Sequence, residues 1–62
     1  MKLGELLNVV DENIDLYVSL AEYECVDHYD GKNGIDEMYN DREVLHITQN
    51  GFGGIVIEIN GH

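Results

Sequence analysis

Apolar residues near the start of the chain recur at the spacing of a helix. Leu3, Leu6, Leu7 and Val10 follow the i, i+3, i+4, i+7 pattern of an amphipathic helix. We therefore predict a helix from Lys2 to Asp11. A glycine inside this helix, Gly4, weakens it by about 1 kcal/mol relative to alanine, so it indicates either a fraying first turn or a close packing contact.

From Ile14 onward, strict alternation of apolar and polar residues replaces the helical spacing. The segment Ile14 to Leu20 is apolar at every second position, which predicts a strand with one buried face. Tyr23 to Tyr29 is predicted as a second strand, with a mixed alternation. Ala21 and Glu22 form only a weak turn between the two, so we expect a bulge or a change of register nearby.

Two further strands are predicted in the second half of the chain, at Glu43 to Gln49 and at Ile55 to Ile59. In the first of these, Leu45 and Ile47 are expected to face the core. The intervening segment, Asn50 to Gly54, predicts a hairpin turn, because Asn-Gly suits positive φ angles.

A dense run of turn formers, Asp30 to Gly34, separates the two pairs of strands. Asn33 is positioned to cap a short helix that continues through Met38 and Tyr39. The predicted order is therefore α-β-β-α-β-β in a single domain, residues 1–62. The fold class is α+β: a small four-stranded, mainly antiparallel sheet whose apolar face is covered by one N-terminal helix and one short helix.

Acidic residues greatly outnumber basic ones. The chain has 62 residues with 13 Asp and Glu against three Lys and Arg, a formal net charge of −10. Such a surface is repelled by DNA, RNA and anionic membranes and is attracted to basic protein surfaces. A chain of this size buries little core, so we also expect self-association to contribute to its stability.

One cysteine, Cys25, excludes an internal disulfide and a zinc site built from several cysteines. The start of the chain lacks a basic region followed by an apolar stretch, and no apolar run reaches the length of a membrane span. These features predict a cytoplasmic protein.

Metal-compatible side chains occur close together between Cys25 and Asp30. On an extended strand Cys25 and His28 project to opposite faces, and Asp27 shares the face of Cys25. We therefore predict no metal site there, and we treat Cys25 as a small apolar residue. A cysteine nucleophile would require His28 or His46 beside it as a base. Only pairing between strands could bring one of these histidines next to Cys25.

No other constellation specifies a reaction. The carboxylates are numerous, but no pocket is evident that would drive two of their pKa values apart. Gly51, Gly53 and Gly54 lead into a strand without the Lys and Ser or Thr of a phosphate-binding loop, so hairpin geometry explains them. We expect no catalytic residue, no enzyme activity and no cofactor.

The acidic residues fall into groups along the polar sides of the predicted elements, where a row of carboxylates resembles a row of phosphates. Such a surface is expected to compete for Lys and Arg grooves that normally hold nucleic acid. Exposed tyrosines among the carboxylates are suited to anchor an interface. The candidate partner-binding residues are Glu22, Glu24, Asp27, Asp30, Asp36, Glu37, Asp41 and Glu43, with Tyr17 or Tyr29 as anchors.

The layout resembles small open reading frames of bacteriophages and prophages, especially those of low-GC Gram-positive hosts. The similar segments are Leu3-Gly4-Glu5-Leu6-Leu7, Ile14 to Leu20, Gly31-Lys32, Arg42-Glu43-Val44 and Ile55 to Ile59. Proteins of this kind include anti-CRISPR and other anti-defence inhibitors, which are often tiny, acidic and non-enzymatic. The resemblance implies an inhibitor that occupies the basic surface of a host nucleic-acid-binding protein, such as a CRISPR effector nuclease.

Two alternatives remain open. The first is a self-associating module in which Ile14 to Leu20 or Ile55 to Ile59 forms an exposed edge that pairs between subunits. The second is an oligomeric sponge for a small signalling nucleotide, with backbone amides near Gly51 to Gly54 holding the phosphate. Solubility alone also accounts for the acidic surface.

Overall fold

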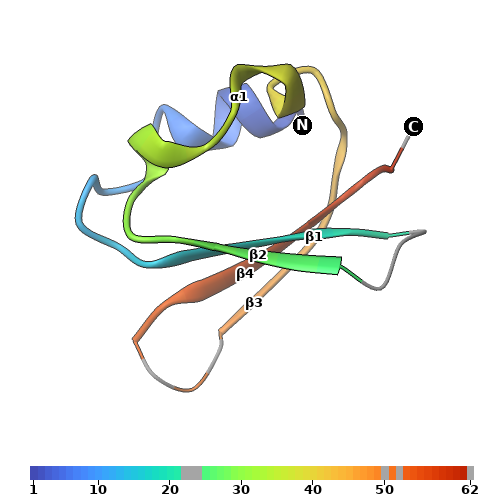
Figure 1. Ribbon diagram of the computed structural model, residues 1–62. Helices are drawn as coiled ribbons and strands as arrows, with labels where there is room; N and C mark the ends of the chain where they lie inside the picture. Colours follow the sequence, from blue (N-terminus) through green and yellow to red (C-terminus); the bar gives the residue numbers. More distant parts are fainter. Residues whose placement is uncertain (22–24, 50, 52, 62) are drawn as a thin grey trace.

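A computed structural model describes residues 1–21, 25–49, 51 and 53–61 of the chain. The described elements are α1 (Leu3–Leu7), β1 (Leu16–Leu20), β2 (Cys25–Tyr29), the short 3-10 helices η1 (Lys32–Gly34) and η2 (Glu37–Tyr39), β3 (Val44–Gln49) and β4 (Ile55–Ile59). The four strands form one sheet, and α1 lies with the 3-10 helices over one face of it (Figure 1). The small α+β class predicted from the sequence is confirmed.

The sheet is mixed, with the strand order β2-β1-β4-β3. β1 and β2 form one antiparallel hairpin, and β3 and β4 form another. The hairpins join through parallel pairing of β1 with β4, where Leu16 lies opposite Ile55 and Val18 opposite Ile57. Two pairings of three are therefore antiparallel, and the connection between the hairpins passes over the helical face.

The core lies between the sheet and the helical layer. Its buried residues are Leu3, Leu6, Leu16, Val18, Ile35, Ile57 and Ile59, and Leu7 and Val10 pack against them. All four apolar positions of the predicted N-terminal helix thus contribute to the core. The regular α-helix itself ends at Leu7, and the chain continues through turns to the start of β1.

A close packing contact explains why position 4 is a glycine. Its backbone N–H donates to the Asn40 carbonyl at 3.0 Å, and a Cβ at this position would lie 3.2 Å from the Cβ of Asn40. Glycine therefore lets α1 approach the turn after η2. Of the two explanations that the sequence allowed, the packing contact is the one observed.

The short helix predicted between the hairpins is two separate 3-10 helices. Asn33 lies inside η1 and does not cap it. The cap of η2 is Asp36, whose side chain accepts a hydrogen bond from the Met38 N–H at 3.0 Å. Because Ile35 between them is extended and buried, it attaches this segment to the core and prevents one continuous helix.

The inward orientation predicted for Leu45 and Ile47 does not bury them: they are 51% and 43% exposed. The pairing of β3 with β4 shifts register between Val44 and His46, so Leu45 lies at a bulge. Ile47 lies opposite Ile57, but β3 is at the edge of the described sheet and has a neighbouring strand on one side only.

The two strands that were candidates for an exposed edge are the two central ones. β1 and β4 each pair on both sides, and the edges are β2 and β3. The register of β1 with β2 is regular over Leu16 to Leu20, whereas the irregularity expected near Ala21 and Glu22 falls next to residues 22–24, outside the described residues. A separate irregularity occurs in β3, between Val44 and His46. No helix among the described residues is long and apolar enough to cross a membrane.

Candidate binding surfaces

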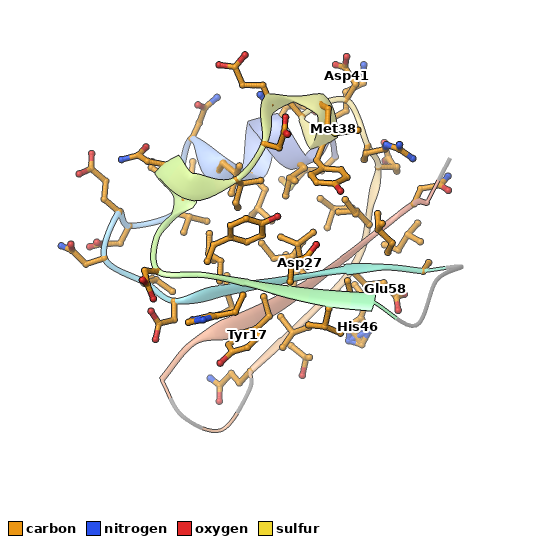
Figure 2. The ribbon with its side chains drawn as sticks, in the orientation of Figure 1. Tyr17, Asp27, Met38, Asp41, His46 and Glu58 are labelled. Carbon is orange, nitrogen blue, oxygen red and sulfur yellow. The ribbon has the colours of Figure 1, made fainter. Side chains whose placement is uncertain are left out.

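Most described carboxylates lie on the helical side of the molecule. They belong to α1, to the turns after it, to η2 and to the entry of β3, and all of them are exposed: Glu5, Asp11, Glu12, Asp36, Glu37, Asp41 and Glu43. Figure 2 shows Asp41 on the helical layer, at the opposite end of the molecule from the uncovered face of the sheet. The covered face therefore carries an acidic outer layer.

Several of these carboxylates also hold local structure. Asp36 caps η2, the Asp11 carboxylate accepts from the Asn13 N–H at 2.8 Å, and the Glu5 carboxylate accepts from the Lys2 N–H at 2.9 Å. Each of these bonds uses one oxygen and leaves the carboxylate charge exposed. Part of the acidic composition is therefore explained by turns and helix starts.

Glu43 binds the amino group of Met1, with 2.7 Å between the nitrogen and Oε1. Hydrogen bonding to Glu43 raises the pKa of this amino group above its usual 8.0. The same contact brings the start of the chain against β3, since the Val44 N–H donates to the Met1 carbonyl at 2.8 Å.

Four carboxylates have no hydrogen bond or ion pair with a described residue: Glu12, Asp27, Glu37 and Glu58. Glu37 lies in η2 next to Met38, whose side chain is 63% exposed. We call the segment Asp36–Asp41 the acidic knob, because it presents three carboxylates around this one apolar side chain. Met38 was assigned to a helix from the sequence, and its exposure follows from the short 3-10 geometry.

The opposite face of the sheet carries no covering layer among the described residues. Leu16, Val18 and Ile57 point into the core, so the residues between them point away from it. This uncovered face consists of Tyr17, Ser19, Val26, His28, His46, Thr48, Val56 and Glu58. Figure 2 shows Tyr17, His46 and Glu58 on this side of the sheet. Only Glu58 in this set is acidic, so most of the described carboxylates lie on the helical side.

A compact group of donor atoms lies at one end of the uncovered face. The imidazole Nε2 of His28 is 3.9 Å from Asp15 and 3.8 Å from Asp30, and the three ligand atoms lie within 4.8 Å of one another. The ring of His28 stacks on Tyr17, with centroids 4.7 Å apart. One nitrogen and two carboxylate oxygens suit a divalent transition metal, and equally a protonated imidazole between two carboxylates.

This group differs from the one considered in the sequence. It keeps His28 and Asp30, adds Asp15 and excludes Asp27, which pairs with Val18 and so faces the helical side. Asp15 lies near Asp30 because β1 and β2 pair with Leu16 opposite Tyr29. Local periodicity cannot predict this register. The side chain of Cys25 lies outside the described part. His46 is separated from β2 by two strands and is not placed beside it.

Two surface grooves are present in the described part of the chain. The larger, about 400 Å³, lies between α1 and the 3-10 helices and includes Lys32, whose Nζ already donates to the Leu7 carbonyl at 2.8 Å. The second, about 260 Å³, is lined by the glycine turn together with Ile14, Gln49 and Ile55. None of its described lining residues is charged, so backbone amides alone would have to hold a phosphate there.

The predicted partner-binding residues are divided among separate places. Asp36, Glu37, Asp41 and Glu43 come together in and next to the acidic knob. Asp27 and Asp30 lie on and just after β2, and Glu22 and Glu24 lie outside the described residues. Tyr17 is on the uncovered face, whereas Tyr29 packs against the core from the helical side. The two tyrosines therefore belong to opposite faces.

Comparison with protein-family models, with curated proteins and with solved structures finds no match for this chain.

Proposed function

We propose that this chain is a non-enzymatic protein-binding module whose acidic knob occupies a basic surface on a nucleic-acid-binding protein. The observation that carries the proposal is the exposed Met38 flanked by Asp36, Glu37 and Asp41. An apolar side chain surrounded by charge has the arrangement of an interface, with a dry centre and a polar rim.

Electrostatics favours this class of partner. The net charge of −10 attracts a Lys- and Arg-rich surface and accelerates encounter with it. The same charge repels nucleic acid, so the chain is suited to compete with nucleic acid and not to bind it. Glu37 has no described intramolecular partner, and its carboxylate is available to a cation on another protein.

The resemblance to small phage proteins suggests a host defence nuclease as the target. In this proposal the knob enters a groove that otherwise holds guide or target strands, and the nuclease loses access to its substrate. Met38 supplies the apolar anchor, and the carboxylates take the positions of phosphates. Inhibition then requires binding alone and no chemistry by this chain.

The test is direct binding to a panel of purified nucleic-acid-binding proteins, including RNA-guided nucleases, at low and high sodium chloride. We expect affinity that falls steeply with salt, because the contacts are ionic. Glu37→Lys should weaken binding by about tenfold or more, equivalent to about 1.4 kcal/mol. The matched control is Glu12→Lys, which makes the same change at another unpartnered glutamate outside the knob.

Each outcome bears on the proposal. Binding that resists salt, or binding to no member of the panel, contradicts an acidic module of this kind. Equal losses in the Glu37 and Glu12 variants would show that net charge alone acts and that the acidic knob is not the site. A further variant, Met38→Ala, should weaken binding without changing its salt dependence, because it removes an apolar contact.

A further inference from the structure

We propose that the open edge of β3 pairs with β3 of a second copy of this chain, which joins two four-stranded sheets into one. β3 is one of the two edge strands of the described sheet. Antiparallel pairing of one strand with its own copy is self-complementary, as a two-fold dimer requires. The inference is independent of the function proposed for the acidic knob.

The hairpin containing β3 has one carboxylate in its two strands, Glu58 of β4, and it follows a long uncharged segment. Residues 44–57 contain no Asp, Glu, Lys or Arg, and the one titratable residue among them is His46. This is the longest interval without a carboxylate in a chain of net charge −10. Two copies that meet at β3 therefore keep their acidic helical layers at a distance, whereas most other contacts would bring like charges together.

The two edges of the sheet are protected differently. β2 carries Asp27, and Asp30 follows directly after its end, so its edge has the charges that usually oppose pairing between molecules. Among the described residues, Met1 and Lys2 pair with the outer edge of β3 where the strand begins. Beyond the bulge at Leu45 the strand continues to Gln49 in regular register.

Exposed apolar side chains lie on this edge. Leu45 and Ile47 remain about half exposed, although Ile47 lies on the same face as the core residue Ile57. These side chains are therefore only partly covered within the described part of the monomer. A second copy of the strand would cover them and would satisfy the outward backbone groups of the edge.

The charge distribution of the chain favours a second copy over an unrelated strand at this edge. A partner with the same acidic surface is repelled least where the two copies meet at the uncharged segment, residues 44–57. Dimerisation should therefore strengthen as sodium chloride screens the repulsion between the copies. Binding of the acidic knob to a basic partner weakens under the same conditions, so the failure of either proposal is distinguishable from the failure of the other.

The test is sedimentation of the full chain over a range of micromolar concentrations, at low and high sodium chloride. We expect a monomer–dimer equilibrium that shifts toward dimer with salt. Ile47→Lys should weaken dimerisation by about tenfold or more, equivalent to about 1.4 kcal/mol. The control is Val9→Lys, the same type of change at a residue that is 79% exposed next to α1. Both variants make the net charge less negative, so only the local effect separates them.

Hydrogen exchange of the unmodified chain provides a second measurement, which does not depend on the folding of a variant. Amides of β3 should gain protection with increasing protein concentration, while those of β2 should not. A chain that remains monomeric at all concentrations, equal dimerisation of the two variants, or protection confined to β2 would overturn the proposal. Pairing of β3 only with an added peptide strand would also overturn it, because the occupant would then be another protein.

Discussion

At the scale of single residues, Gly31 is where a side chain is least tolerated. A Cβ there would lie 2.5 Å from the carbonyl oxygen of Glu12, whereas the nearest atom to a Cβ on Gly34 is 3.6 Å away. Gly31→Ala should therefore destabilise the fold by about 1–3 kcal/mol, since backbone has to move. Gly34→Ala is the matched control and should change stability little. Urea unfolding of both variants measures the difference, and equal effects would show that this approach of backbone to backbone is unimportant.

At the scale of elements, the start of the chain is attached to β3 through the Met1 amino group, which binds Glu43. Bonding to Glu43 raises the pKa of the Met1 amino group above 8.0. A raised folded-state pKa gives stabilisation that is complete below pH 8 and is lost as the pH rises through the folded-state value. Stability should therefore decline above pH 8 more steeply in the unmodified chain than in Glu43→Gln. Thermal unfolding across this pH range measures the decline in stability. Parallel pH profiles of the two proteins would show that the bond between Met1 and Glu43 does not stabilise the fold.

The elements also show what the sequence could and could not predict. Apolar spacing identified Leu3 and Leu6 as core residues and β1 as a half-buried strand, because both depend on local periodicity. Strand order depends on contacts between distant segments, so the periodicity could not show that β4 pairs in parallel with β1. Burial on β3 was predicted wrongly for the same reason, since the extent of the helical layer decides it. The sequence named Asp36, Glu37 and Asp41 among a longer series of acidic candidates, whereas the exposure of Met38 and the group around His28 required the fold.

At the scale of the whole molecule, we expect the acidic layer to oppose folding. A net charge of −10 is held within a body of 27 × 22 × 17 Å, so many carboxylates lie within a few screening lengths of one another. Neutralising three of the four that lack described partners, in the variant Glu12→Gln, Asp27→Asn, Glu37→Gln, should relieve repulsion. We expect a gain of up to about 0.5 kcal/mol for each substitution, as for other surface changes. Urea unfolding at low and high sodium chloride measures the gain, which should shrink as salt screens the charges.

The sign of that gain decides how the charge of the molecule is to be interpreted. Asp36→Ala is the contrasting variant, since loss of the η2 cap should cost about 1 kcal/mol despite removing a charge. If the unpartnered carboxylates destabilise the fold while the capping carboxylate stabilises it, the acidic residues divide into two classes with different roles. Those that weaken the monomer then require a reason outside it, and a basic partner supplies one. If the triple variant is less stable than the unmodified chain, these carboxylates stabilise the fold itself, and the acidic surface no longer indicates a basic partner.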